Sequence, residues 1–289
     1  MFSWSSRQLL WLLALVALAV GCGEERQRAS SASQPSTEDA GPIHVHGLGV
    51  NPKDRALYIA THTGLFRAAE AGGKAERVGD DQQDTMGFTV VGPDRFLGSG
   101  HPDPSQDLPP LLGLIRSSDG GQSWEPQSLS GEADFHVLRS AGERVYGFDA
   151  SNARLLMSSD GGASWTQLEP PGPLLDLAID REDPDKLVAS TDQLLVTSAD
   201  QGKSWKPAFR SDPGLLAWPS PESLYRVDGT GQVSVSDDAG NGWRPRGSIG
   251  GQPAAFTAVD ERTLYAALPD GTIMGSSDGG AAWRVRSRP

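Results

Sequence analysis

Five histidines are the side chains of this 289-residue chain best suited to bind a metal ion: His44, His46, His62, His101 and His136. His44 and His46 lie in the segment IHVHGLGV, whose small and aliphatic residues are typical of a β-strand. Side chains two residues apart on a strand point to the same face, so we expect these two rings to lie together. Two imidazoles on one face are a starting point for a copper or zinc site.

Two other side chains are candidate ligands for the same ion. Met86, in QDTMGF, lies near the start of a second predicted strand, and Asp134 precedes His136 by two residues in EADFHVL. A thioether beside imidazoles favours copper, whereas a carboxylate beside imidazoles favours zinc or another divalent ion. Both metals stay open. If no metal binds, the five histidines are either exposed loop residues or residues whose rings hydrogen-bond to nearby backbone carbonyl groups.

A repeated turn defines the elements that must position these histidines. The pattern S-x-D-x-G-x-x-W occurs five times, and its tryptophans follow one another at intervals of 41, 40, 38 and 40 residues. We expect each aspartate to accept hydrogen bonds from its own turn, and each tryptophan to pack against neighbouring structure. The role is structural rather than catalytic for Asp119, Asp160, Asp200, Asp238, Asp278, Trp124, Trp165, Trp205, Trp243 and Trp283.

The spacing of these turns predicts the fold. Short strand-like segments separated by Gly, Pro and Asp turns give six units of about 40 residues over positions 43–289. Repeats of this length are typical of β-propeller blades, so we predict an all-β, six-bladed β-propeller. The predicted blades are residues 43–82, 83–131, 132–172, 173–212, 213–251 and 252–289.

This architecture gathers the histidines. In a propeller, the first strand of each blade lines the central channel, and the repeated turns join the third and fourth strands on one face. All five histidines map to the opposite face, in the first three blades, around the mouth of the channel. The long proline-rich loop from His101 to Leu112 begins there, and it is either a lid over the mouth or a rigid loop packed on the third blade.

The N-terminal segment predicts export and a membrane anchor. Arg7 precedes an apolar run from Leu9 to Val20, which is too short to span a bilayer. Ending in LAVGC, the run resembles a bacterial lipoprotein signal, with residues 1–21 as the signal peptide and Cys22 as the lipidated residue. Residues 22–42 then form a flexible tether. The expected location is extracytoplasmic, on the periplasmic or cell-surface side; an ordinary secretory signal is the alternative.

The charge of the chain excludes one class of partner. The formal net charge is −12 and the isoelectric point is near 4.8, which argues against a nucleic-acid partner because phosphate binding relies on lysine and arginine. Cys22 is the only cysteine, so no disulfide can form within the chain.

The repeated turns resemble Asp-boxes, also called BNR repeats. The chain as a whole is most similar to bacterial lipoprotein propellers that carry them, through segments such as HVHGLGVNP, ATHTGLF and GEADFHVL. More loosely, it resembles sortilin-type ectodomains and the propellers that help assemble photosystems, which bind partners rather than catalyse a reaction. The resemblance implies a membrane-tethered propeller whose channel mouth binds a metal, a small ligand or a protein.

Two alternatives come from the same resemblance. Asp-box lipoproteins are often called glycosyl hydrolases or exo-sialidases, but the Phe/Tyr-Arg-Ile-Pro motif of sialidases does not occur here. Another glycosidase would need a pair of carboxylates at the channel mouth, for which the candidates are Asp84, Glu132, Asp134, Asp149 and Asp176. A protein-assembly scaffold without a ligand site is the other alternative. We predict a non-catalytic binding propeller with copper or zinc as its ligand.

Overall fold

The computed structural model describes residues 41–208 and 212–289. The predicted signal peptide, Cys22 and nearly all of the tether therefore lie outside the described residues. Within those residues, no helix is long and apolar enough to cross a membrane. Residues 39–289 form one compact unit.

The described residues form six four-stranded antiparallel sheets, each built from four consecutive strands. Blade 1 consists of β1 (Val45–Val50), β2 (Leu57–Thr61), β3 (Gly64–Arg67) and β4 (Glu76–Val78). Blade 2 consists of β5 (Asp84–Gly92), β6 (Arg95–His101), β7 (Leu114–Ser117) and β8 (Glu125–Ser128). Blade 3 consists of β9 (Phe135–Ala141), β10 (Arg144–Asp149), β11 (Arg154–Ser158) and β12 (Thr166–Leu168).

The second half of the chain repeats this arrangement. Blade 4 consists of β13 (Leu174–Ile179), β14 (Leu187–Thr191), β15 (Leu195–Ser198) and β16 (Lys206–Pro207). Blade 5 consists of β17 (Leu215–Ser220), β18 (Ser223–Val227), β19 (Gln232–Ser236) and β20 (Arg244–Ser248). Blade 6 consists of β21 (Ala255–Ala258), β22 (Leu264–Ala267), β23 (Ile273–Ser276) and β24 (Arg284–Ser287).

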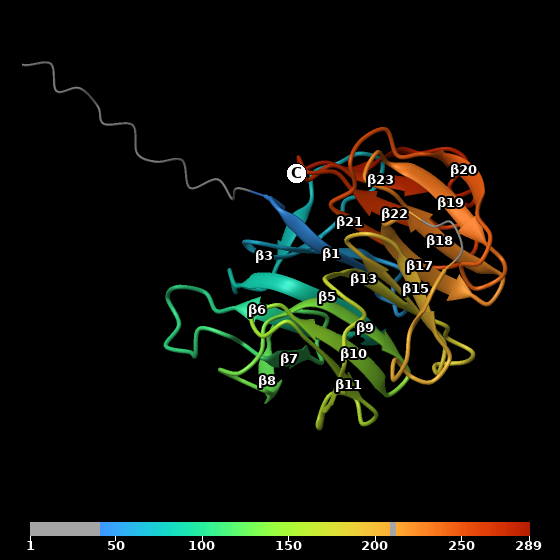
Figure 1. The fold of residues 1–289 in the computed structure, drawn as a ribbon. Helices are drawn as coiled ribbons and strands as arrows, with labels where there is room; N and C mark the ends of the chain where they lie inside the picture. Colours follow the sequence, from blue (N-terminus) through green and yellow to red (C-terminus); the bar gives the residue numbers. More distant parts are fainter. Residues whose placement is uncertain (1–40, 209–211) are drawn as a thin grey trace, which may run out of the picture. The chain divides into compact units, whose positions relative to one another are not determined.

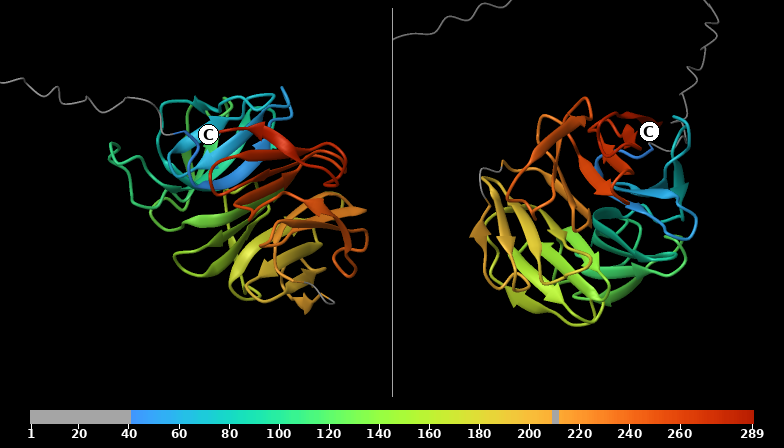
Figure 2. Two further views of the ribbon diagram at one scale, coloured as in Figure 1. Left: turned by 90° about the horizontal axis from the view of Figure 1, so that it is seen from above. Right: turned by 90° about the vertical axis from the view of Figure 1, so that its right-hand side faces the viewer.

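The six blades form a ring, which confirms the predicted six-bladed β-propeller. The first strand of each blade contacts the first strand of the next, and β21 contacts β1, so the ring is closed (Figure 1). Chain order follows the ring once around (Figure 2). These six first strands line the central channel. Each one enters from the face that carries the histidines, which we call the top face, and leaves at the opposite, bottom face.

Apolar packing between neighbouring blades holds the ring together. Each of the six blade interfaces contains its own cluster of buried residues. In five of them, the tryptophan of a repeated turn packs against the cluster that its blade shares with the preceding blade. The ring of Trp165 lies 5.0 Å from that of Phe135, and its Nε1 donates to Ser128 Oγ at 2.9 Å. The tryptophans therefore join blades, as predicted.

The sixth interface, between blades 6 and 1, is closed differently because blade 1 lacks the repeated turn. Its β3–β4 connection pairs with the C-terminal residues instead. Ala75 N donates to Arg288 O at 3.0 Å, and Arg288 N donates to Gly73 O at 2.9 Å. Backbone hydrogen bonds thus replace the missing tryptophan where the two ends of the ring meet.

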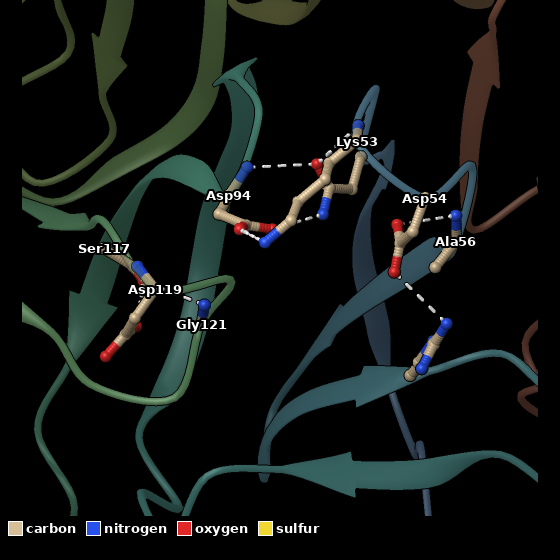
Figure 3. Close-up of polar contacts among 9 residues, drawn as sticks. Lys53, Asp54, Ala56, Asp94, Ser117, Asp119 and Gly121 are labelled. Atoms are coloured by element: carbon tan, nitrogen blue, oxygen red, sulfur yellow. Dashed lines mark hydrogen bonds and ion pairs between the residues drawn. The ribbon is translucent and has the colours of Figure 1, made fainter.

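The repeated turns share one hydrogen-bond pattern on the bottom face. In the first copy, Ser117 Oγ accepts from Gly121 N and donates to Asp119 Oδ1, both at 2.8 Å (Figure 3). Asp119 Oδ1 also accepts from Ser123 N at 3.0 Å. Gly121 has a φ of 88°, and a Cβ there would lie 2.3 Å from Leu65, so the turn requires glycine. The equivalent serine and aspartate make the same contacts in the other four copies.

A neighbouring set of polar contacts joins blades 1 and 2 on this face. Asn51 Nδ2 donates to Asp94 Oδ1 at 2.8 Å, and Asp94 N donates back to Asn51 Oδ1 at 3.1 Å. Lys53 forms an ion pair with the same carboxylate (Figure 3). The acidic side chains of the bottom face thus hold connections between strands.

Candidate metal centre at the channel mouth

Three side chains from blades 1 and 2 converge at the top of the channel. His46 is the second residue of β1, His62 lies in the β2–β3 turn, and Asp84 opens β5. His62 Nδ1 lies 2.8 Å from Asp84 Oδ2, and His46 Nε2 lies 3.5 Å from Asp84 Oδ1. One nitrogen from each ring and one carboxylate oxygen all lie within 4.8 Å of one another. This spacing suits a single metal ion.

Two atoms of this group are buried without a hydrogen bond. His46 Nε2 and Asp84 Oδ1 have no hydrogen-bond partner among the described residues, although they face each other. Buried polar atoms nearly always have a hydrogen-bond partner, so two neighbouring buried atoms without one require an explanation. A metal ion bound between them would satisfy both atoms.

The electrostatic surroundings keep Asp84 ionised. Burial by itself would raise the pKa of Asp84, but a hydrogen-bonding contact with His46 and electrostatic interaction with His46, His62 and His101 lower it below its usual value. The carboxylate is therefore available as an anionic ligand at neutral pH.

His44 does not lie on the strand that was predicted for it. It precedes β1 in a bend with a φ of 52°, and a β-bulge follows between Val45 and Gly47. The alternation that was expected to align His44 with His46 therefore does not apply, and that expectation was wrong. The exposed His44 ring instead lies 5.8 Å from the ring of His62, with their centroids as the end points. Its place is beside the group, above His62.

The remaining two histidines gather around a second carboxylate, on blades 2 and 3. His136 Nε2 lies 2.8 Å from Asp134 Oδ2, and His101 Nε2 lies 3.5 Å from the same oxygen. Asp134 Oδ1 is buried and has no hydrogen-bond partner among the described residues. The hydrogen bond to Asp134 raises the pKa of His136, although burial opposes the shift.

The proline-rich loop orients His101 but does not cover the channel. Pro110 O lies 3.0 Å from His101 Nδ1, which leaves Nε2 directed at Asp134. The loop packs on both sides: Gln106 Nε2 donates to Asp81 Oδ1 at 2.8 Å, and Gly131 N donates to Leu111 O at 2.8 Å. Among the described residues that line the central cavity, none belongs to positions 102–112. The loop therefore packs beside Asp134 and His101 and is not a lid over the channel.

A cavity of about 280 Å³ lies below the two groups, inside the ring. All six inner strands contribute to its wall, and His46, Met86 and His136 line it. Met86 thus faces the channel, two residues after Asp84 on the same strand. Sequence reasoning had considered Asp84 only as a carboxylate for a glycosidase and missed its place between two histidines. Asp84 lies at the start of an inner strand, as His46 does, and this shared position in the repeat could have indicated that the two side chains meet.

Two other candidate carboxylates of a glycosidase, Asp149 and Asp176, are held by neighbouring groups, whereas Glu132 is an exposed residue. Buried Asp149 accepts from Arg154 Nε at 2.7 Å, Asn152 Nδ2 at 2.8 Å and Asp134 N at 3.1 Å. Asp176 accepts from Arg139 at 2.6 Å and from the amide of Leu216 at 2.8 Å. Burial raises the pKa of Asp176, against the effect of Arg139. Asp149 and Asp176 therefore serve the structure.

Comparison with known proteins shows the class of fold. No protein-family model matches the chain, and no curated protein matches it. The solved structure of YCF48 from Cyanidioschyzon merolae is similar over 86% of this chain and 86% of that chain, with 16% identity and a TM-score of 0.52. A propeller in a nidogen/laminin complex is similar over 81% of this chain and 93% of that chain, with 14% identity and a TM-score of 0.63.

An enzyme also shares the fold. The GH74 xyloglucanase from Xanthomonas campestris is similar over 85% of this chain but only 45% of that chain, with 18% identity and a TM-score of 0.51. At these identities the similarities show a β-propeller and nothing of its ligand. The resemblance to Asp-box lipoproteins, the anchor at Cys22 and the extracytoplasmic location stay predictions.

Proposed function

We propose that this propeller is a binding protein that holds one transition-metal ion at the channel mouth through His46, His62 and Asp84. The observation that carries the proposal is the pair of buried, unpartnered atoms, His46 Nε2 and Asp84 Oδ1, beside His62. Two imidazoles and a carboxylate form a ligand set typical of zinc, with a fourth position left for water or a ligand. Cu(II) is the second metal that this set fits.

The distances between the ligand atoms support a site that needs little rearrangement. Zinc bonds of roughly 2.0–2.1 Å in tetrahedral geometry separate neighbouring ligand atoms by about 3.3 Å. The 3.5 Å between His46 and Asp84 is already close to that value, whereas the 2.8 Å between His62 and Asp84 must lengthen slightly. His62 lies in an exposed turn, so this adjustment requires no movement of a strand.

Two of the five candidate carboxylates of a glycosidase are already held by other groups, which favours binding over hydrolysis. Asp149 and Asp176 accept hydrogen bonds from arginine and backbone amides, so they do not offer a free acid and base across the channel. The role outside the cytoplasm is metal handling, with the propeller tethered to a membrane through lipidated Cys22. A Cys22→Ala variant should lose both lipid labelling and sedimentation with membranes.

Metal titration of the full chain carrying Cys22→Ala tests the site, since this background removes the only thiol. Zn(II) and Cu(II) should each be titrated calorimetrically. We expect one tight equivalent in the parent and none in His46→Ala/His62→Ala. The matched control is His101→Ala/His136→Ala, which removes the same number of rings from the second carboxylate and should keep the tight equivalent. A parent that binds neither metal, or a first variant that binds like the parent, would overturn the proposal.

A further inference from the structure

Below the histidines, two cavities of the central channel adjoin each other and share part of their lining. The upper cavity, of about 280 Å³, lies toward the top face, and a second cavity of about 420 Å³ opens toward the bottom face. Both are lined by the same small set of residues, which we call the waist: Leu48, Thr89, Ser140, Arg181, Thr257 and Ala258.

Arg181 is the only charged residue of the waist. It follows β13 by two residues and reaches into the channel from blade 4. Other arginines of the channel wall have acidic partners: Arg139 pairs with Asp176 at 2.6 Å, and Arg55 lies 3.8 Å from Asp260. Among the described residues, Arg181 has no hydrogen bond or ion pair. The Arg181 side chain is exposed to channel water, and partial burial against the channel walls lowers the pKa of its guanidinium below the usual value. The group remains charged at neutral pH.

Three residues with hydroxyl groups line the waist together with Arg181. These are Thr89 from β5, Ser140 from β9 and Thr257 from β21. Thr89 Oγ1 and Ser140 Oγ lie 3.1 Å apart, so one donates to the other and the acceptor retains a free proton. A guanidinium and hydroxyl donors that line one cavity are the kinds of group that recognise an oxyanion.

The charge of the channel opposes that of the whole chain. The chain carries a formal charge of −12, but the charged residues lining the two cavities, apart from histidines, are Arg55, Arg139, Arg181 and a single acid, Asp176. Asp176 is neutralised by Arg139. Protein walls around an unpaired charge leave less water to screen it than an open surface does, so Arg181 is a site that attracts anions although the chain as a whole is acidic.

We infer that the waist of the channel is a binding site for a small oxyanion, either a carboxylate or a phosphate, held by Arg181 and the hydroxyls of Thr89, Ser140 and Thr257. A carboxylate with a short apolar chain would also fill the upper cavity, whose wall includes Phe88, Trp218 and Phe256. Inorganic phosphate would contact only Arg181 and the three hydroxyl groups of the waist. This site lies below the metal group and needs none of its ligands.

Calorimetric titration of the full chain with sodium hexanoate and with sodium phosphate tests the inference. A chelator is present and chloride is low, so metal binding cannot contribute. We expect saturable binding of at least one anion to the wild type. Arg181→Gln should weaken it by at least about tenfold, which is the loss of a charged hydrogen-bond partner, and Arg181→Lys should retain part of it. Arg116→Gln, an equal charge change on exposed β7, should have no effect.

These titrations distinguish an organic carboxylate from inorganic phosphate as the ligand, and they distinguish loss of binding from loss of folding. Tighter binding of hexanoate assigns the site to organic carboxylates, and tighter binding of phosphate assigns it to inorganic oxyanions. Arg181→Gln should melt no lower than the wild type because no partner is lost, so weakened binding would not reflect unfolding. The inference is overturned if neither anion binds, if Arg181→Gln binds like the wild type, or if neutral hexanamide binds as tightly as hexanoate.

Discussion

Aspartates at the two ends of this propeller are satisfied in opposite ways. On the bottom face, Asp160 accepts hydrogen bonds from the Ser158 and Ser164 hydroxyls and from the amides of Ala163 and Ser164, all within its own turn. Its pKa falls to about 2, chiefly through the Ser164 hydroxyl. On the top face, the carboxylates of Asp84 and Asp134 contact histidines, and within the described part of the chain each keeps one buried oxygen without a partner.

The difference separates structural from functional acid groups of the same type. A carboxylate whose acceptor sites are filled by its own turn has none left for a ligand. A carboxylate held by ionisable rings, with an orphan oxygen, is stable only when something else completes it. Exposure alone would suggest the opposite assignment, because the turn aspartates, which have no free acceptor site, are more exposed than Asp84 and Asp134.

The largest expected effect comes from changing one aspartate at each end. Asp84→Asn keeps the shape of the side chain but removes the anionic ligand, so Zn(II) affinity should fall by at least about 100-fold. Asp160→Asn makes the same change in a bottom turn and should leave Zn(II) affinity unaltered. Calorimetric titration of both variants measures the two values, and equal losses would remove the contrast between the ends.

Acid should release the metal before it affects the turns. Protons compete with Zn(II) for imidazole nitrogens, so Zn(II) affinity should drop about 10- to 100-fold as the pH falls from roughly 7 to 5. Asp160 and Asp200, with pKa values of about 2, lie below the ~3.9 of an unfolded chain. Their stabilisation is present above about pH 4 and is lost as the pH falls toward 2. Circular dichroism should therefore show a folded, metal-free propeller at about pH 5; unfolding in step with metal release would contradict this.

Loss of one turn serine should cost stability without affecting the site. Ser158 Oγ is buried and accepts from Gly162 N at 2.8 Å. Ser158→Ala leaves that amide without a partner and should lower the free energy of unfolding by about 1–3 kcal/mol. Urea denaturation measures the change, with Ser123→Ala as an exposed control in another turn. If Zn(II) affinity falls with stability, the two ends are coupled rather than independent.

The smallest expected effect is a pH dependence at the second carboxylate. Asp134 raises the pKa of His136 above the ~6.5 of an unfolded chain. The stabilisation from this pair is fully present below about pH 6.5 and is lost as the pH rises through the folded-state pKa. His136→Gln should therefore destabilise the protein by a few tenths of a kcal/mol at about pH 5.5, since the ring is partly exposed, and by less at about pH 8.5. An equal effect at both pH values would rule out the charged pair.

The architecture could be read from the chain because its determinants are local. Each repeated turn contains its own serine, aspartate and glycine within eight residues, and their hydrogen bonds form whatever the rest of the molecule does. Five copies at a constant interval then determine the strand count, the six blades and the face on which each histidine lies. The top-face placement of all five histidines followed from strand direction alone.

Only the tertiary structure decided which side chains meet. Asp84 joins His46 and His62 because blades 1 and 2 pack side by side, and neither contact lies within a single repeat. A bulge in β1 and a left-handed bend moved His44 off the strand, which periodicity does not encode. Arg181 shares its place in the channel with Thr89, Ser140 and Thr257 only because the ring brings four different blades together. Local hydrogen bonding is determined by neighbouring residues, whereas a site shared between blades depends on how their apolar faces pack.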